Sequence, residues 1–158
     1  MRSILLCSTA LIILLSACTP ANEAPDAKEP APEVTAAPDT SATPSTVLST
    51  HYVDAAAALA ADNFDKAKAS LTALAKESTG ELKTLAQTAA DTGDIAAMRD
   101  AFKAVSNVAT TMELPPDHAV AFCPMYKGGA KWVQKKDELA NPYYGSASTM
   151  ASCGNFVN

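Results

Sequence analysis

The stretch DIAAMRDAFKAVSNVATTM, from Asp94 to Met112, carries the clearest helical pattern of the chain. Apolar side chains recur in it every three or four residues, which places them on one face of an α-helix. These residues are Ile95, Met98, Phe102, Val105, Ala109 and Met112. Asp94 is a suitable N-cap, and Pro115-Pro116 cannot continue the helix. The stretch therefore predicts an amphipathic helix that buries one face.

Three earlier segments between Ser45 and Leu114 repeat this pattern, and short breaks separate them. The breaks are Asp62-Asn63, Gly80 and Thr92-Gly93. Because short connections place neighbouring helices antiparallel, the four segments predict an all-α fold, a small up-down four-helix bundle. We expect its core to contain Phe64, Leu71, Leu74, Leu82, Leu85, Ile95, Phe102 and Val105.

The helical period is lost beyond Pro116, and the C-terminal segment is typical of irregular structure. Ala119–Phe122 and Lys131–Val133 could pair as two short β-strands across Gly128-Gly129. Since the many alanines of the helices contribute little apolar area each, we expect this segment to pack on the bundle and complete its core.

The N-terminus is typical of a secreted lipoprotein. Met1-Arg2 precedes an apolar run from Ile4 to Leu15 that is too short to cross a bilayer. The run ends in Leu15-Ser16-Ala17-Cys18, which resembles the bacterial lipobox. That resemblance implies that residues 1–17 are a signal peptide, and that lipid on Cys18 joins the chain to a membrane. By resemblance to diderm lipoproteins, Thr19 after the cysteine favours the outer membrane, on the periplasmic face of the cell envelope.

Residues 18–44 predict the lipidated cysteine followed by a disordered tether. Six of the ten prolines fall between residues 19 and 44, and no aromatic residue does. Such a segment buries too little apolar surface to offset its ordering entropy. Residues 45–158 then form a single helical domain. The chain carries a net charge of −5 and shows no basic patch, so nucleic acid is not an expected partner.

Two sulfur pairs lie in the C-terminal segment, Cys123-Pro124-Met125 and Met150-Ala151-Ser152-Cys153. Thiolate and thioether are soft ligands, which favour Cu(I)-like ions over Mg²⁺ or Ca²⁺. The pattern predicts a metal site formed by Cys123, Met125, Met150 and Cys153. The two cysteines could instead form a structural disulfide, because disulfides persist outside the cytoplasm.

Several short motifs, in their order and spacing, carry a resemblance to a known family. They are Arg99-x-x-Phe102-x-x-x-Ser106, Cys123-Pro124-Met125, Trp132-Val133, Asn141-Pro142-Tyr143-Tyr144-Gly145 and Met150-x-x-Cys153-Gly154. Over roughly residues 48–156 the chain resembles the domain of unknown function 3347. Members of that family are small secreted or lipid-anchored proteins, or are fused to periplasmic adaptor subunits of copper/silver efflux pumps. The resemblance implies binding of copper(I) or silver(I), with a component of a heavy-metal efflux system as partner.

The remaining motif residues are expected to have structural roles. Arg99 and Ser106 are seven residues apart and share a helix face, so we expect them to tie down the C-terminal segment by hydrogen bonds to its backbone. The other residues of this structural set are Phe102, Trp132, Asn141, Pro142, Tyr143, Tyr144 and Gly145. The Asn-Pro pair indicates a turn, and the aromatic residues are expected to pack.

The sequence does not indicate an enzyme. A cysteine nucleophile needs a base such as histidine, and His51 and His118 stand in no recognisable catalytic arrangement. Two hypotheses remain. The chain is a lipid-anchored protein that binds a soft metal ion for sequestration or delivery to efflux, or it is a disulfide-stapled module, closed by Cys123 and Cys153, that docks on an envelope partner.

The lipobox makes a direct prediction about anchoring. Replacing Cys18 by Ser removes the sulfur that would carry lipid, so the protein should move from the membrane fraction to the soluble fraction. Cys7→Ser is the matched control, because Cys7 would leave with the signal peptide. Cell fractionation measures the result. A Cys18→Ser protein that remains as membrane-bound as the unaltered chain would show that the anchor is wrongly assigned.

Overall fold

The computed structural model describes residues 44–157 of the chain. The predicted signal peptide, Cys18 and all but the last residue of the predicted tether lie outside these residues. In the described part of the chain, no helix is long and apolar enough to cross a membrane.

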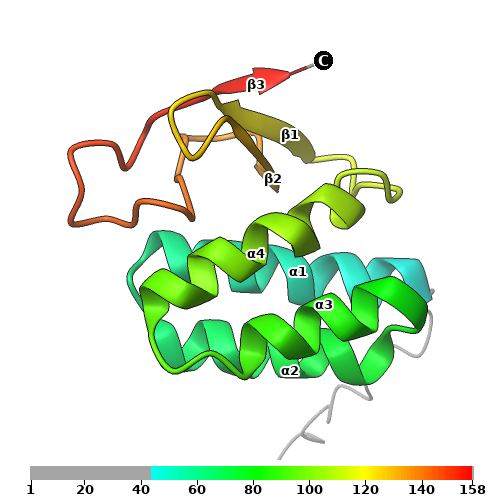
Figure 1. Ribbon diagram of the computed structural model, residues 1–158. Helices are drawn as coiled ribbons and strands as arrows, with labels where there is room; N and C mark the ends of the chain where they lie inside the picture. The colour runs from blue at the N-terminus through cyan, green and yellow to red at the C-terminus, as the bar shows by residue number, and fades with distance from the viewer. Residues whose placement is uncertain (1–43, 158) are drawn as a thin grey trace, which may run out of the picture. The chain divides into compact units, whose positions relative to one another are not determined.

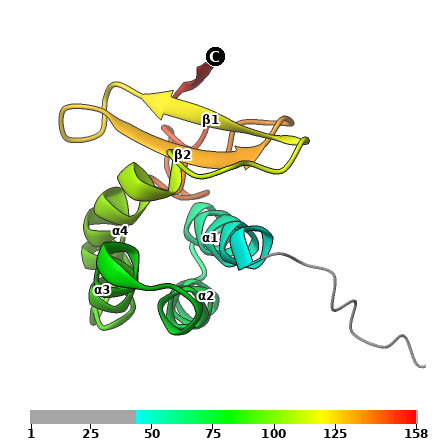
Figure 2. The ribbon, with the colours of Figure 1, turned by 90° about the vertical axis from the view of Figure 1, so that its right-hand side faces the viewer.

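Four helices form the first part of this region: α1 (Pro44–Ala60), α2 (Phe64–Glu77), α3 (Gly80–Ala90) and α4 (Ile95–Ala109). Each helix packs against the next in the sequence (Figures 1 and 2). Asn63 caps α2 by accepting a hydrogen bond from Lys66 N, and Asp94 caps α4 by accepting one from Ala97 N. These caps satisfy backbone donors that a helix leaves unpaired at its start.

The all-α prediction is wrong, because the C-terminal segment forms a three-stranded antiparallel sheet and the fold is mixed α/β. The strands are β1 (His118–Cys123), β2 (Ala130–Lys135) and β3 (Asn155–Val157), in the order β2-β1-β3. A hairpin joins β1 to β2, with Val120 opposite Val133. β3 returns to the far side of β1, where Val157 also lies opposite Val120. This long-range pairing has no local sequence signal, which explains why the sequence indicated at most two short strands and not a three-stranded sheet.

The sheet meets the helices through the edge of β2, which lies nearest to them (Figure 1). The Tyr52 hydroxyl on α1 accepts a hydrogen bond from Val133 N, and the Tyr143 hydroxyl donates one to Lys131 O. Two tyrosine hydroxyls therefore satisfy backbone groups that an open strand edge would leave unpaired.

Aromatic packing joins the helices to the C-terminal segment. The Phe102 ring on α4 stacks on Tyr52, with ring centroids 5.2 Å apart, and lies 6.1 Å from the Tyr143 ring. Tyr143 in turn contacts Trp132 edge to face, at 6.0 Å. Of the predicted core residues, Leu71, Leu74, Leu82, Phe102 and Val105 are buried, whereas Phe64, Leu85 and Ile95 are only half-buried.

Arg99 on α4 connects three parts of the fold. Its Nε donates to Pro142 O at 2.9 Å, and its Nη2 donates to Leu59 O and to Asp62 Oδ1, each at 2.7 Å. The contact with Pro142 is a hydrogen bond to the backbone of the C-terminal segment. Ser106 lies on the same helix but bonds the Tyr52 hydroxyl at 2.7 Å.

Asp62 completes this network from the turn between α1 and α2. Its Oδ2 accepts hydrogen bonds from Ser146 Oγ at 2.8 Å and from Ala147 N at 3.0 Å. The Arg99 hydrogen bond, followed by those from Ser146 and Ala147, holds the pKa of the Asp62 carboxyl well below its usual range. The sequence pattern showed Asp62 only as a helix break, because its partners are distant in the sequence.

A substitution at Gly145 can test this arrangement, because Gly145 lies against the Arg99–Asp62 pair with a φ of +74°. A Cβ there would lie 2.1 Å from Arg99 Nη2 and 2.2 Å from Asp62 Oδ1. Gly145→Ala should therefore lower the free energy of unfolding by about 2–5 kcal/mol, from backbone strain and steric overlap together.

The matched control for this substitution is Gly128→Ala. Gly128 also has a positive φ, of +82°, but no atom lies within 4 Å of its would-be Cβ. This variant should lose only about 1–2 kcal/mol, from backbone strain alone. Chemical denaturation of both variants measures the difference, and equal losses would contradict a tight contact at residue 145.

Candidate functional site

The two cysteines meet at one end of the sheet. The turn at residues 136–140, which follows β2, lies at the opposite end. Cys123 is the last residue of β1, and Cys153 lies directly before Gly154 and β3. Their sulfur atoms are 2.7 Å apart, and both are free thiols in the structure. Cys123 is fully buried, whereas Cys153 is half-buried. One thiol of the pair can therefore be reached from solvent, and the other lies behind it.

Asn141 fixes the backbone on the Cys153 side. Its Nδ2 donates to Cys153 O at 2.7 Å, and its backbone N–H donates to Ala151 O at 2.7 Å. Its Oδ1 accepts from Tyr143 N at 2.9 Å. All of these groups are bonded and Asn141 is buried, so the turn that carries Cys153 is tied to the start of the Asn-Pro-Tyr-Tyr segment.

Glycine at position 154 lets the chain pass close to the sheet. Its φ is +144°, and a Cβ there would lie 2.8 Å from the Trp132 ring and 3.0 Å from Phe122 O. The backbone after Cys153 thus lies directly against β1 and the tryptophan. This close approach brings the Cys153 sulfur to the Cys123 sulfur.

The electrostatic environment disfavours the Cys153 thiolate in the reduced protein. The hydrogen bond with the Cys123 thiol is the main cause of a raised Cys153 pKa, and burial and charge repulsion from Cys123 add to it. The Met125 backbone N–H acts in the opposite direction and lowers the pKa of Cys153. That effect places the Met125 backbone beside the Cys153 sulfur.

The two methionines lie in the turns next to the cysteines. Met125 follows Cys123 by two residues and is 65% exposed. Met150 is half-buried and begins the turn that ends at Cys153, whose N–H donates to Met150 O at 2.9 Å. The structure thus brings the segments of all four predicted ligands to one corner, with contact between the two cysteine sulfurs. Within residues 44–157, no group of three or more His, Cys, Asp or Glu side chains is placed to share a metal ion.

His118 does not belong to this corner, because it begins the strand that Cys123 ends. At about 3.4 Å per residue, the two positions are roughly 17 Å apart. The His118 ring instead pairs with Asp117.

Comparison of the chain with models of protein families, with curated proteins and with solved structures gives no match.

The difference in exposure between the two cysteines predicts an order of reaction. In the reduced, folded protein, iodoacetamide should alkylate half-buried Cys153 well before fully buried Cys123. Mass spectrometry of the two cysteine peptides over time measures the initial rates. The control is the protein in denaturant, where both thiols should react at similar rates. Similar rates in the folded protein would show that Cys123 is not shielded as the structure indicates.

Proposed function

We propose that the chain is a lipid-anchored envelope protein that binds a soft metal ion, copper(I) or silver(I), at Cys123 and Cys153. The observation that carries this proposal is the convergence of the two thiols, one of them open to solvent, beside the mostly exposed Met125. The ion is cargo, taken up and passed on, rather than a permanent part of the fold.

The donor set suits a soft monovalent ion in its chemistry. Two thiolates would supply charge and most of the affinity, and thioethers would complete the coordination without adding charge. A closed zinc site requires four ligands drawn from Cys, His and carboxylates, a set that differs from two thiols and two thioethers. The proposed site therefore favours Cu(I) or Ag(I) over Zn²⁺.

The distance between the sulfurs shows what binding requires of the chain. Two metal–thiolate bonds of about 2.3 Å at a tetrahedral angle place their sulfurs roughly 3.7 Å apart. The sulfurs are 2.7 Å apart in this structure, so they would have to separate by about 1 Å. Cys153 lies in a turn, and its side chain is the less buried of the two. It is the ligand that would move, while Cys123 stays fixed on β1.

Access also fits a carrier of metal ions. Met125 is 65% exposed, and its backbone lies beside the Cys153 sulfur. An exposed thioether next to a half-buried thiol gives an incoming ion a first ligand at the surface. The sequence resemblance to a family found with copper/silver efflux adaptors supports a component of such a system as the partner that receives the ion.

A second candidate function is favoured by the sulfur contact itself. Thiols 2.7 Å apart can form a disulfide with little movement. That bond would close a loop of about thirty residues and stabilise the fold by roughly 3–4 kcal/mol in the chain-entropy model. The protein would then be a disulfide-stapled module that docks on an envelope partner. A disulfide and a bound metal exclude each other, because the metal needs the thiolates.

Titration with Cu(I) under reducing conditions tests the proposal. The reduced protein should bind one ion per chain in competition with a chromophoric Cu(I) chelator. Replacing Met125 and Met150 together by Leu removes both thioethers at nearly constant volume, and should weaken binding about tenfold, the equivalent of roughly 1.4 kcal/mol. Met112→Leu is the matched control and should bind like the unaltered chain, because Met112 follows α4 and belongs to neither sulfur pair.

The cysteine variants separate metal binding from fold stability. Cys153→Ser should abolish one-to-one binding while circular dichroism still shows the folded protein. If Cys153→Ser binds Cu(I) as before, the proposed site is wrong. If the thiols resist reduction in folded protein and no Cu(I) binds, the disulfide-stapled module is the better account.

A further inference from the structure

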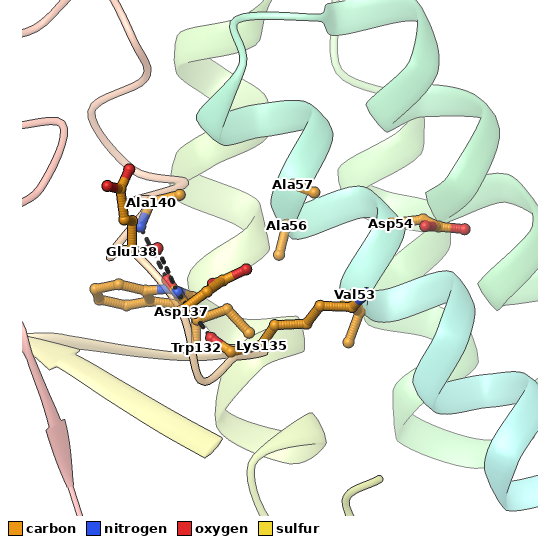
Figure 3. A pocket seen from close by; sticks show the side chains of 10 residues that line it. Val53, Asp54, Ala56, Ala57, Trp132, Lys135, Asp137, Glu138 and Ala140 are labelled. Carbon is orange, nitrogen blue, oxygen red and sulfur yellow. Dashed lines mark hydrogen bonds between the residues drawn. The ribbon is translucent and has the colours of Figure 1, made fainter. Parts of the chain in front are cut away.

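A hollow of about 530 Å³ lies between α1, β2 and the turn at residues 136–140 (Figure 3). It is at the opposite end of β2 from the cysteines, since Ala130 pairs with Cys123 whereas the pocket residue Gln134 pairs with Ala119. Its size is in the range of small-molecule sites. None of the four predicted metal ligands lines this hollow.

The hollow exists because α1 presents small side chains to the sheet. Ala56 and Ala57 form its floor with Val53, whereas the ring of Trp132, which borders the hollow, is fully buried and points away from the alanines (Figure 3). Larger residues at the two alanine positions would fill the space. The floor offers an apolar surface to a ligand, as small-molecule sites commonly do.

Gln134 makes the remaining wall rigid. Its Oε1 accepts hydrogen bonds from Trp132 Nε1 at 2.8 Å and from Ala140 N at 3.0 Å. Its Nε2 donates to Lys135 O at 3.1 Å and to Glu138 O at 3.0 Å. One buried amide thus holds both ends of the turn against β2, so the hollow is formed before any ligand enters. The sequence pattern did not single out Gln134, because a lone glutamine in a strand gives no signal.

The rim of the hollow is acidic. Asp54 on α1 and Asp137 and Glu138 on the turn line it, against the single cation Lys135. Three carboxylates and one ammonium leave two negative charges. In Figure 3 the Asp137 carboxylate stands between the turn and α1, and the Lys135 chain reaches across toward Val53.

The neighbouring cation Lys136 does not neutralise this rim. The Lys136 amine donates to Pro116 O at 3.3 Å, away from the residues that line the hollow. Lys135 also acts on Asp117, whose pKa is lowered mainly by a hydrogen bond with His118 and to a small degree by the Lys135 charge. Lys135 nevertheless lines the hollow, and the net rim charge of two negative charges includes its ammonium.

We propose that this hollow binds a small amphipathic cation: an apolar body that packs on the floor formed by Val53, Ala56 and Ala57, with an amine or guanidinium group held at the acidic rim. The apolar floor selects against fully polar polyamines, and the rim selects against anions of the same shape. Charge complementarity and the preformed wall support this ligand class.

Three probes of one shape test the role of charge: phenylbutylamine, phenylbutanol and phenylbutyrate. They are titrated into the full chain carrying Cys18→Ser, which needs no detergent. Binding is followed by the fluorescence of Trp132, the only tryptophan, and by the amide resonances of Ala57 and Ala140. We expect a dissociation constant of about millimolar for the amine, about tenfold weaker binding of the alcohol, and no binding of the acid.

Variants of the rim show whether these carboxylates are responsible. Asp54→Asn combined with Asp137→Asn should weaken binding of the amine about fivefold to tenfold and leave binding of the alcohol unchanged. Glu81→Gln with Asp65→Asn removes the same charge from α3 and α2, away from the hollow, and should change neither. All four residues are exposed, so the variants should fold, and circular dichroism verifies this.

The possible outcomes either support or overturn the proposal. Selective binding of the amine that is lost in the rim variant supports it. Equal binding of the amine and the acid, equal effects of the rim and control variants, or shifts confined to residues outside the hollow would overturn it. No binding of any probe at ten times the expected dissociation constant would also overturn it. None of these results bears on metal binding by the cysteines.

Discussion

The guanidinium of Arg99 joins three segments that are far apart in the sequence: the end of α1, the α1–α2 turn and the Asn-Pro-Tyr-Tyr segment. Its hydrogen bonds reach Leu59 O, Asp62 and Pro142 O from a largely buried position on α4. Removing it would leave the buried Pro142 O without its donor, which costs more than the hydrogen bond itself contributes, while Leu59 O would keep the hydrogen bond from Asp62 N. Because the Asp62 pKa is lowered in the folded protein, this carboxylate stabilises the fold above its unfolded pKa of about 3.9, and the contribution is lost as the pH falls through the lower folded value.

The position of the cysteine pair follows from this anchor. Pro142, held by Arg99, is preceded by Asn141, which bonds the backbone of Cys153. The Tyr143 ring then packs between Phe102 of α4 and Trp132 of β2. Hydrogen bonds therefore connect the buried Arg99, through the Asn141-Pro142 turn, to the backbone of the half-buried Cys153. Within this account, the helices and the sheet are scaffolds that bring two sulfurs, thirty residues apart in the sequence, into contact.

Local patterns in the sequence predicted the helices, because apolar spacing and caps act over a few residues. Phe102 and Leu71 are buried as their spacing indicated, and Asp94 caps α4. The sheet was underestimated because β3 pairs with β1 only after a long excursion of the chain. Asp62 and Gln134 were missed for related reasons. The partners of Asp62 are distant in the sequence and are brought close by the fold. Gln134 bonds mainly to backbone groups, which every residue type carries and which therefore leave no sequence signal. For the candidate site, the sequence indicated the cysteines but not that Met125 would be exposed while Cys123 is fully buried.

The central functional claim is that Cys123 and Cys153, when reduced, share one soft metal ion. X-ray absorption spectroscopy on the reduced chain loaded with one equivalent of Cu(I) tests it most directly. The account predicts a first coordination shell of sulfur alone, with bonds of about 2.3 Å, and loss of part of that shell when Met125 and Met150 are both Leu. A shell dominated by nitrogen or oxygen, or a spectrum unchanged by Cys153→Ser, would contradict the claim.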